Sequence, residues 1–363
     1  MTVRSVTSFM SHLRKYGSAD RTAPSFRASV RALCAGGIAS FAATAGASPG
    51  SVPAAEAPPP PAAIVEDHGP EFATPTTLDR AGRIVAPVEI NGRGPFRFIL
   101  DTGANRSAMS AATAEALGLV ADEDSKVSVH GITGSAVLPV VKVETFRAGE
   151  LVFERQRLPV LPSAVFGGVD GILGIDVLQS ARVEVDFDLD KVTIRKSSGA
   201  RAPAGYLVVP AKLKHGGLLL VAGKVGKVPV KAILDTGAER SLGNEALREA
   251  LVLRARDPQE GVATTVIGAT PQLAEGTSFV APAIAVGGAR LTNLTVTFSD
   301  LHVFKIWSLL DEPALLIGMD LLGTMQQFVV DYRRREFHFK TWPSGRTNKR
   351  CIDVGCKLWI SGG

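Results

Sequence analysis

The stretch Phe98-Ile99-Leu100-Asp101-Thr102-Gly103-Ala104 places an Asp-Thr-Gly-Ala motif directly after an apolar run. The same arrangement recurs at Ala232-Ile233-Leu234-Asp235-Thr236-Gly237-Ala238. The two copies lie about 130 residues apart, roughly the size of one compact domain. An internal repeat of this length predicts two equivalent halves of the chain, each of which contributes one aspartate.

The repeat extends beyond the motif on both sides. Each copy follows a strand pattern that ends in a glycine turn, at 84–92 and at 218–226. Each copy is followed by a short helical pattern, a glycine-containing turn, an apolar-apolar-Gly-x-Asp segment and a pair of strand-like runs. These landmarks are 109–118, 131–134, 172–176 and 183–194 in the first half, and 243–251, 268–271, 316–320 and 328–339 in the second. Their shared order predicts that the chain arose by duplication of one lobe.

The composition is typical of a soluble globular protein built mainly from strands. Of the 363 residues, 45% are hydrophobic and 21% are charged, and many short strand-like runs between Gly and Pro residues favour an all-β fold. The formal net charge of +5 belongs entirely to residues 1–47. Because basic and acidic residues balance in the rest of the chain, the charge gives no reason to expect a nucleic-acid partner.

Residues 1–47 have the pattern of an export signal peptide. A basic stretch ends at Arg31, an apolar run covers 32–43, and small residues that suit signal cleavage follow at 43–47. The alternative is an uncleaved N-terminal anchor, but the apolar run is short and rich in Gly and Ala for a membrane span. We therefore expect an exported protein, periplasmic or secreted, with no stable membrane association once the signal is removed.

Composition also divides the rest of the chain. The expected segments are a Pro/Ala-rich extended linker at 48–78, an N-terminal lobe at 79–204, a C-terminal lobe at 205–342 and a basic tail at 343–363. Cys351 and Cys356 in the tail favour a local disulfide in an oxidising compartment. A metal site is not expected, because two cysteines are too few ligands and the histidines are scattered singly along the chain.

The repeated motif has the features needed for two aspartates that act as a pair. Two carboxylates held close together cannot both ionise easily, so they share one proton and can activate a water molecule for hydrolysis of a peptide bond. The threonine hydroxyls can form hydrogen bonds across the lobe interface, and the glycines allow close backbone approach. This chemistry needs no metal and no organic cofactor. The candidate residues are Asp101 and Asp235 as the catalytic pair, with Thr102, Gly103, Thr236 and Gly237 as support.

On these motifs the chain resembles the retropepsin and pepsin-type aspartic peptidases, and most of all the bacterial retropepsin-like proteins with two lobes fused in one chain. The resemblance covers about 79–342 and rests on both Asp-Thr-Gly motifs and on Leu173-Gly174 and Ile317-Gly318. It implies an all-β, bilobal acid-protease fold: two duplicated β-barrel lobes with short helices. It also implies hairpin flaps that close over the substrate, here formed by Gly131, Ile132, Thr133 and Gly134 and, in the second lobe, by Gly268.

Other conspicuous residues have simpler interpretations. Asp176 and Asp320 follow the glycine elements and are expected to cap helices or bind nearby backbone amides rather than to react. Asp186 and Asp331 are expected at strand edges or turns. Trp307 fits packing better than a substrate pocket.

The sequence leaves three functional interpretations. The first is an exported aspartic endopeptidase that cleaves polypeptides as a monomer, through a cleft on its own pseudo-two-fold axis. The second is a non-catalytic module that keeps the protease fold to bind peptides, although both aspartates are present. The third is a dimer in which lobes pair with those of another chain.

Overall fold

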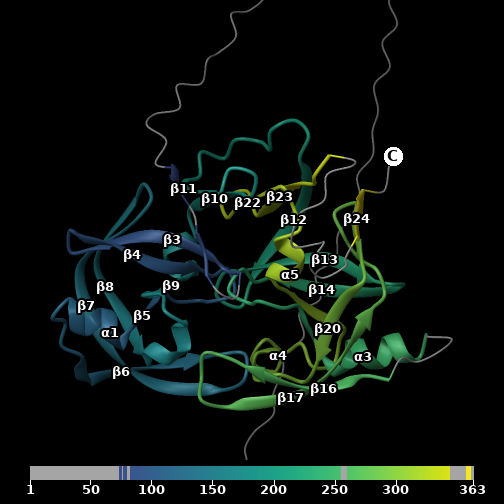
Figure 1. The fold of residues 1–363 in the computed structure, drawn as a ribbon, viewed down its shortest axis with the longest axis horizontal. Helices are drawn as coiled ribbons and strands as arrows, with labels where there is room; N and C mark the ends of the chain where they lie inside the picture. Colours follow the sequence, from purple (N-terminus) through teal and green to yellow (C-terminus); the bar gives the residue numbers. More distant parts are fainter. Residues whose placement is uncertain (1–72, 76, 80–81, 255–259, 344–356, 361–363) are drawn as a thin grey trace, which may run out of the picture. The chain divides into compact units, whose positions relative to one another are not determined.

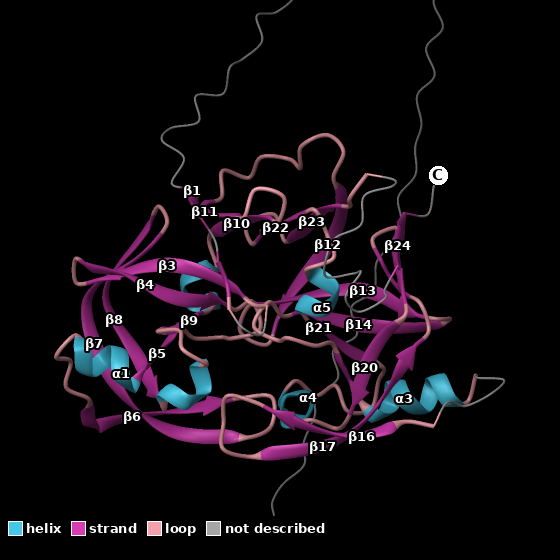
Figure 2. Ribbon diagram, viewed as in Figure 1, coloured by secondary structure: helices cyan, strands magenta, loops and turns pink. Residues whose placement is uncertain are grey.

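The computed structural model describes residues 73–75, 77–79, 82–254, 260–343 and 357–360. These residues belong to one unit, 66–363, and most of them lie in strands, with a few short helices (Figures 1 and 2). The predicted signal peptide or anchor and the cysteine pair lie outside the described residues. Within the described ranges, no helix is both long and apolar enough to cross a membrane.

The N-terminal lobe is a closed sheet whose strands surround the first motif. An edge strand, β2 (Thr77–Leu78), pairs with β3. The following strands are β3 (Ile84–Ile90), β4 (Arg93–Leu100), β9 (Gly171–Leu173), β5 (Ala108–Ser110), β8 (Leu151–Leu161), β7 (Ser135–Ala148) and β6 (Asp122–His130), in spatial order. The far end of β7 pairs back onto β3, which closes the barrel.

The C-terminal lobe repeats this order strand for strand. Its strands are β13 (Leu218–Val225), β14 (Val228–Leu234), β21 (Ala314–Ile317), β15 (Leu242–Gly243), β20 (Leu294–Phe298), β17 (Leu273–Ala281) and β16 (Val262–Ile267). Here Pro282 ends β17, because proline lacks the N–H that a sheet needs. The chain resumes as β18 (Ile284–Val286), which pairs with β13 and closes the second barrel, and then forms β19 (Ala289–Thr292). The expected duplicated, bilobal all-β fold is confirmed.

Short helices follow the catalytic loops in both lobes, as the sequence predicts. They are α1 (Ala111–Ala116) and α3 (Glu245–Val252) after the motifs, and α2 (Ile175–Leu178) and α5 (Met319–Leu322) after the glycine elements. Ser110 and Asn244 cap the first two, since each side chain accepts a hydrogen bond from the backbone N–H three residues later. The lobes differ between their last two barrel strands. The N-terminal lobe has a 3-10 turn there, η1 (Ser163–Phe166), and the C-terminal lobe has α4 (His302–Ile306).

A six-stranded sheet joins the two lobes. Its strands, in order, are β1 (Ala73–Pro75), β11 (Lys191–Lys196), β10 (Ala181–Asp186), β22 (Gln327–Asp331), β23 (Glu336–Lys340) and β12 (Leu207–Lys214). The central pair, β10 and β22, is antiparallel, with Glu184 opposite Val329. The strand pairs that the sequence predicts near 183–194 and 328–339 therefore form one structure that belongs to both lobes.

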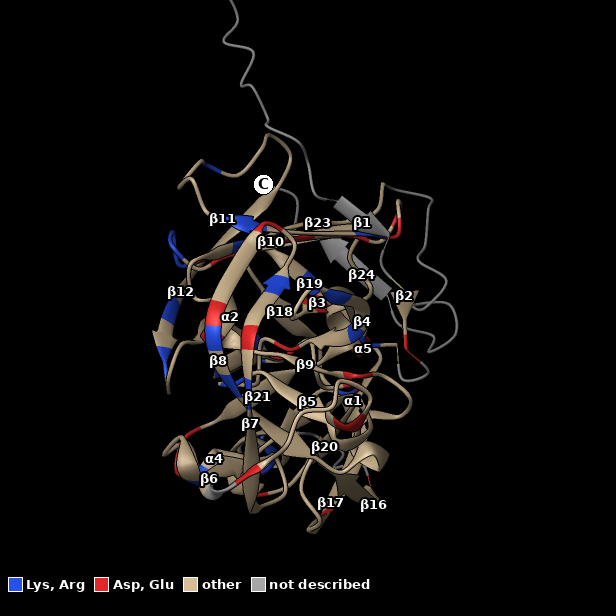
Figure 3. Cartoon of the chain, turned by 90° about the vertical axis from the view of Figure 1, so that its left-hand side faces the viewer, with Lys and Arg blue, Asp and Glu red and all other residues tan. Residues whose placement is uncertain are grey.

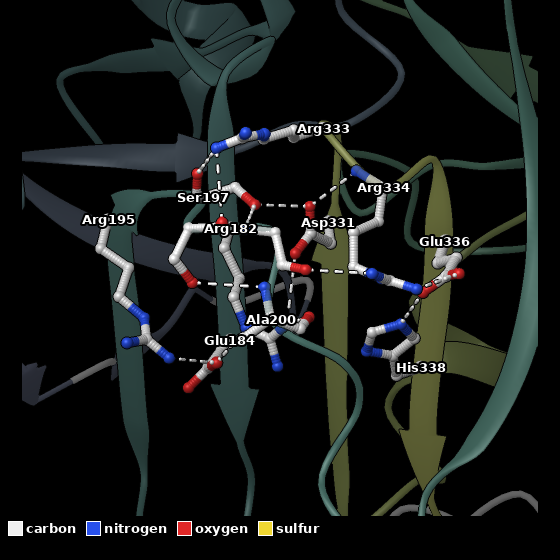
Figure 4. A network of polar contacts seen from close by, with 12 residues as sticks. Arg182, Glu184, Arg195, Ser197, Ala200, Asp331, Arg333, Arg334, Glu336 and His338 are labelled. Atoms are coloured by element: carbon white, nitrogen blue, oxygen red, sulfur yellow. Dashed lines mark hydrogen bonds and ion pairs between the residues drawn. The ribbon is translucent and has the colours of Figure 1, made fainter. Parts of the chain in front are cut away.

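A buried polar network crosses this sheet (Figure 4). Asp331 is fully buried and accepts hydrogen bonds from Ser197 Oγ at 2.8 Å and from Arg334 N at 3.0 Å. It also forms an ion pair with Arg182 Nη1 of the other lobe at 3.2 Å. Asp331 is the last residue of β22 and binds Arg334 N in the turn to β23, so the expected position at a turn is confirmed, although the sequence did not predict its complete burial. Asp186, its counterpart, also lies at a turn and accepts from two backbone amides there.

Three described strands lie outside the predicted lobes. Residues 73–75 and 77–78, at the end of the predicted linker, form the edge strands β1 and β2, so an unstructured linker was the wrong expectation for them. In the predicted tail, β24 (Lys357–Ile360) pairs with β19. Edge strands need only backbone hydrogen bonds to one neighbour, so their sequences carry little apolar alternation to reveal them.

Apolar side chains fill both barrels and form one continuous cluster that spans the two lobes. Its aromatic contacts include an edge-to-face pair, Phe98 and Phe146, in the N-terminal lobe and a stacked pair, Phe279 and Phe298, in the C-terminal lobe. On the surface, acidic and basic positions lie next to one another on several strands (Figure 3). This mixture agrees with the balanced charge of the chain after residue 47.

Candidate active site

Each catalytic loop begins where a buried strand ends beside a parallel neighbour. β4 pairs with β9 up to Leu100 opposite Leu173, and β14 pairs with β21 up to Leu234 opposite Ile317. The next backbone amides continue the pattern, since Asp101 N donates to Leu173 O at 3.0 Å and Asp235 N donates to Ile317 O at 2.9 Å. The apolar-apolar-Gly segment thus fixes the backbone of each aspartate.

The two motif threonines connect the loops across the lobe interface. Thr102 N donates to Thr236 Oγ1 and Thr236 N donates to Thr102 Oγ1, both at 3.1 Å. Each hydroxyl in turn donates to a carbonyl of the opposite lobe: Thr102 Oγ1 to Leu234 O at 2.8 Å and Thr236 Oγ1 to Leu100 O at 2.6 Å. Both side chains are buried, so these four reciprocal bonds hold the loops together.

The motif glycines explain how the two carboxyl groups come together. A Cβ atom placed on Gly103 would overlap the carboxyl group of Asp235, and one placed on Gly237 would overlap that of Asp101. Each carboxyl group therefore packs against the bare backbone of the opposite loop. Any side chain at either glycine would occupy the space that the aspartate of the other lobe needs.

The two aspartates form a coupled pair with perturbed acidity. Asp101 and Asp235 are hydrogen-bonded to each other, and each also accepts from its own loop, through Gly103 N at 2.9 Å and Gly237 N at 2.9 Å. Burial raises the pKa of Asp101. Burial and the neighbouring charge of Asp101 together raise the pKa of Asp235 well above its ordinary range. The pair therefore keeps a proton at pH values where ordinary aspartates are ionised.

Behind each loop lies a serine–aspartate pair that the sequence interpretation only half identified. Ser107 N and Oγ donate to Asp176 Oδ1 at 2.9 and 2.8 Å, and Ser241 N and Oγ donate to Asp320 at 2.8 and 2.7 Å. As expected, the two aspartates bind backbone amides. These amides belong to Ser107 and Ser241, in the segments that follow the Asp-Thr-Gly motifs. The serines were missed, although both motifs are followed by an Arg-Ser pair that places a serine at the sixth position after the aspartate. Burial raises the pKa of Asp320 to about 6.

The predicted flaps are hairpin turns that meet each other. Residues 131–134 connect β6 to β7, and 268–272 connect β16 to β17. Thr133 Oγ1 lies 3.2 Å from Thr270 Oγ1, and Gln272 Nε2 donates to Ser135 O at 3.1 Å. The structure therefore brings the two predicted flap turns, Gly131–Gly134 and the one containing Gly268, into direct contact. Gln272 was not singled out in the sequence.

Comparison with protein families gives the same division of the chain. A family model described as aspartyl protease matches twice, over residues 86–177 and 221–321. The chain belongs to the aspartyl protease family. Each match runs from the first barrel strand to the helix after the glycine element, so one aspartyl protease unit corresponds to one lobe. A search of curated proteins found no match.

As an aspartyl protease, the chain belongs to a hydrolase family whose substrates are peptides. Among the residues that the structure describes, no group of three or more His, Cys, Asp and Glu side chains could hold a metal ion. Trp307 is buried and packs against Phe304 and His215, which agrees with a packing role.

Proposed function

We propose that the protein is an exported aspartic endopeptidase that hydrolyses peptide bonds with a water molecule activated by Asp101 and Asp235. One observation carries this proposal: two buried, hydrogen-bonded carboxyl groups with raised pKa values lie on equivalent loops of two lobes. A pair that shares one proton has both an acid and a base available at the same place.

The reaction follows from that protonation state. The pair shares one proton, and in the proposed reaction Asp235 carries it while Asp101 is ionised. Asp101 removes a proton from the water as the water oxygen attacks the peptide carbonyl carbon. The Asp235 carboxyl donates to the carbonyl oxygen and stabilises the gem-diol. Asp101 then passes the proton that it took from the water to the amide nitrogen, and a gem-diol hydroxyl returns a proton to Asp235. The C–N bond breaks and releases an amine and a carboxylic acid, which ionises in solution.

The remaining candidate residues have supporting roles in this proposal. Thr102 and Thr236 keep the loops rigid, and Gly103 and Gly237 leave room for the opposite carboxyl group. The flap turns, Gly131–Gly134 and the turn containing Gly268, close over an extended polypeptide. The chain acts as a monomer, since its own two lobes supply both aspartates.

Export is part of the proposal and rests on residues 1–47. Their basic stretch, apolar run and small residues suit a cleaved signal peptide. Fractionation of the source cells, with N-terminal sequencing of the mature protein, tests this part. A mature N-terminus near residue 47 supports export, and retention of residue 1 in a membrane fraction supports the anchor.

The activity is tested with a digest of proteome-derived peptides by the mature protein. Asp101→Asn and Asp235→Asn should each lower cleavage by roughly 10²–10⁴-fold or more, because each removes one member of the acid–base pair. Asp190→Asn, in an exposed turn, is the matched control and should cleave normally. Normal turnover by either dyad variant would refute the mechanism, and wild-type protein that binds peptides without cutting them would favour the binding module.

A further inference from the structure

A serine at the base of the N-terminal flap lies between two histidines from different lobes. Ser135 begins β7, and its Oγ is 2.6 Å from Nδ1 of His130 and 2.6 Å from Nε2 of His302. The two imidazole rings are 5.9 Å apart, centroid to centroid, and tilted by 35°. One hydroxyl therefore connects the flap of the N-terminal lobe to the first residue of α4 in the C-terminal lobe.

The same helix also contacts the tip of the flap. Val303 N, in the first turn of α4, donates to Ile132 O at 3.4 Å. α4 lies beside the flap end of β6 in two perpendicular views (Figures 1 and 3). The N-terminal lobe has the turn η1 at the position equivalent to α4. Ala269 of the second flap turn packs against the apolar cluster that includes Phe166 of η1, and no described backbone hydrogen bond joins that turn to η1.

The three groups are limited in which of them can donate and which can accept a hydrogen bond. A serine hydroxyl has one proton to donate and two lone pairs that accept. Because the hydroxyl can donate to only one imidazole nitrogen, at least one of the two imidazoles carries its own proton and donates to Ser135. Replacement of the serine by a residue without a hydroxyl removes both bonds at once.

The other contacts at the flap are few. The flap tip, Gly131–Gly134, has no charged side chain, and its described cross-lobe polar contacts are the long Val303 bond and the Thr133–Thr270 hydroxyl pair. Gln272 adds one bond to the Ser135 carbonyl. The short Ser135–His302 bond is thus a large share of what holds this flap against the C-terminal lobe, while the His130 bond, within the same hairpin, orients the Ser135 hydroxyl.

We propose that His130, Ser135 and His302 form a latch that holds the N-terminal flap closed and limits how often this flap opens. The latch rests on the proposed function in one respect, that substrate enters when the flap opens. Its members are positioning residues, because they hold the flap and do not touch the reacting atoms. The latch forms both in the free protein and over a bound ligand, so its loss raises the opening rate in both states.

Hydrogen exchange measured by NMR tests the latch without any need for activity. Ser135→Ala and His302→Phe should speed exchange of the Val303 amide by roughly two- to tenfold, which corresponds to one or two lost hydrogen bonds. Ser135→Thr keeps the hydroxyl and should restore slow exchange. The Gly131 amide donates to Gly134 O inside the flap turn and serves as an internal reporter, which should not change unless the hairpin itself unfolds.

A matched control separates the latch from general weakening of the hairpin. Ser128 is an exposed serine on β6, and Ser128→Ala should leave Val303 exchange as in the wild type. Val303 exchange that is unchanged in both latch variants, or that rises equally in Ser128→Ala, would overturn the proposal.

Binding kinetics of a statine-type transition-state mimic give the second readout. If the latch closes over free and occupied sites alike, Ser135→Ala should raise the association and dissociation rates by the same factor and leave Kd unchanged. A change in Kd with unchanged rates would mean a distorted site rather than a released flap, and would contradict the latch. No binding by the wild type would instead count against the proposed function, while the exchange experiment would still decide the latch.

Discussion

The two lobes are alike around the dyad and different at the flaps. Seven strands follow the same order in each, and each catalytic loop has the same parallel neighbour, threonine bonds and serine–aspartate pair. At the flaps, β7 runs unbroken for 14 residues, whereas Pro282 divides its counterpart into β17 and β18. α4 occurs on one side only. The two lobes are therefore symmetric at the Asp-Thr-Gly loops and asymmetric at the flap turns.

The carboxyl groups of Asp101 and Asp235 have different surroundings. Burial raises the pKa of both aspartates, and the neighbouring charge of Asp101 raises that of Asp235 further, whereas hydrogen bonds from its own loop and the charge of Arg83 oppose the rise at Asp101. Asp235 is also buried, whereas Asp101 is partly exposed, so identical motifs acquire different surroundings.

The largest effects are expected at the glycines that face the opposite carboxyl groups. Gly103→Ala and Gly237→Ala should each reduce kcat/KM by about 10²-fold or more, because the new methyl displaces the aspartate of the other lobe and small displacements of reacting groups have effects of this size. The two losses should be similar if the lobes contribute equally. Gly92→Ala is the control for a glycine replacement in a turn of the N-terminal lobe: a Cβ there meets no atom within 4 Å, and although its φ of +69° strains that turn, the folded protein should retain activity. A fully active Gly237→Ala enzyme would show that the two glycines do not contribute equally.

The shared sheet predicts a strong difference between equivalent positions. Asp331→Asn should lower the free energy of unfolding by about 3 kcal/mol, because it removes the fully buried partner of Arg182 Nη1 and leaves Glu184 as the remaining ionic partner of Arg182. Asp186→Asn, at the equivalent position of β10, should lower it by less than about 1 kcal/mol, since its turn is near the surface and asparagine still accepts the backbone bonds. Urea unfolding of both variants measures the difference, and equal losses would contradict the assignment of Asp331 as the buried centre of the network.

The serine–aspartate pairs predict a pH dependence of stability that differs between lobes. The pKa of Asp320 is raised from its ordinary 3.8 to about 6 in the folded protein, so the folded state binds this proton more tightly than the unfolded state. Stability from this group is therefore complete below about pH 4 and is lost as the pH rises through 6, by about 3 kcal/mol at most.

Asp320→Asn cannot ionise and should flatten the profile of unfolding free energy between pH 4 and 7. Asp176→Asn should flatten it less, because the pKa of Asp176 is raised by the same cause, burial, without reaching so high a value. Urea titrations at several pH values measure both profiles. An Asp320→Asn profile parallel to that of the wild type would show that the group does not titrate in this range.

The smallest differences are expected at the threonines. Thr102→Ala and Thr236→Ala should each lower the free energy of unfolding by about 1–3 kcal/mol, because each leaves a buried amide and a buried carbonyl of the other lobe without a partner. Serine at either position keeps the hydroxyl and should restore most of the loss. If one alanine variant were neutral, the reciprocal arrangement would not hold the loops equally.

Much of the architecture could be predicted because the chain repeats itself. The duplicated landmarks identified the hairpins, the short helices and the strands beside each catalytic loop. Single residues without a repeated pattern were harder. His130, Ser135 and His302 are unremarkable in sequence, and only tertiary packing brings them together. The turn position of Asp331 was predicted, but its complete burial was not, because the sequence does not reveal that two strand pairs join into one sheet. The catalytic and flap roles of the candidate residues stay predictions.

The pairing of β10 with β22 has a consequence for a chain that is cut. Cleavage in the segment between β11 and β12 would separate the strands into two halves, each with an unsatisfied row of backbone donors and acceptors along one border. These exposed edges belong to β10 and β22, which pair in antiparallel register in the intact protein, so each fragment could pair with the other in the same way. Co-expressed halves should therefore reconstitute the enzyme, whereas a half produced alone should self-associate through the exposed border.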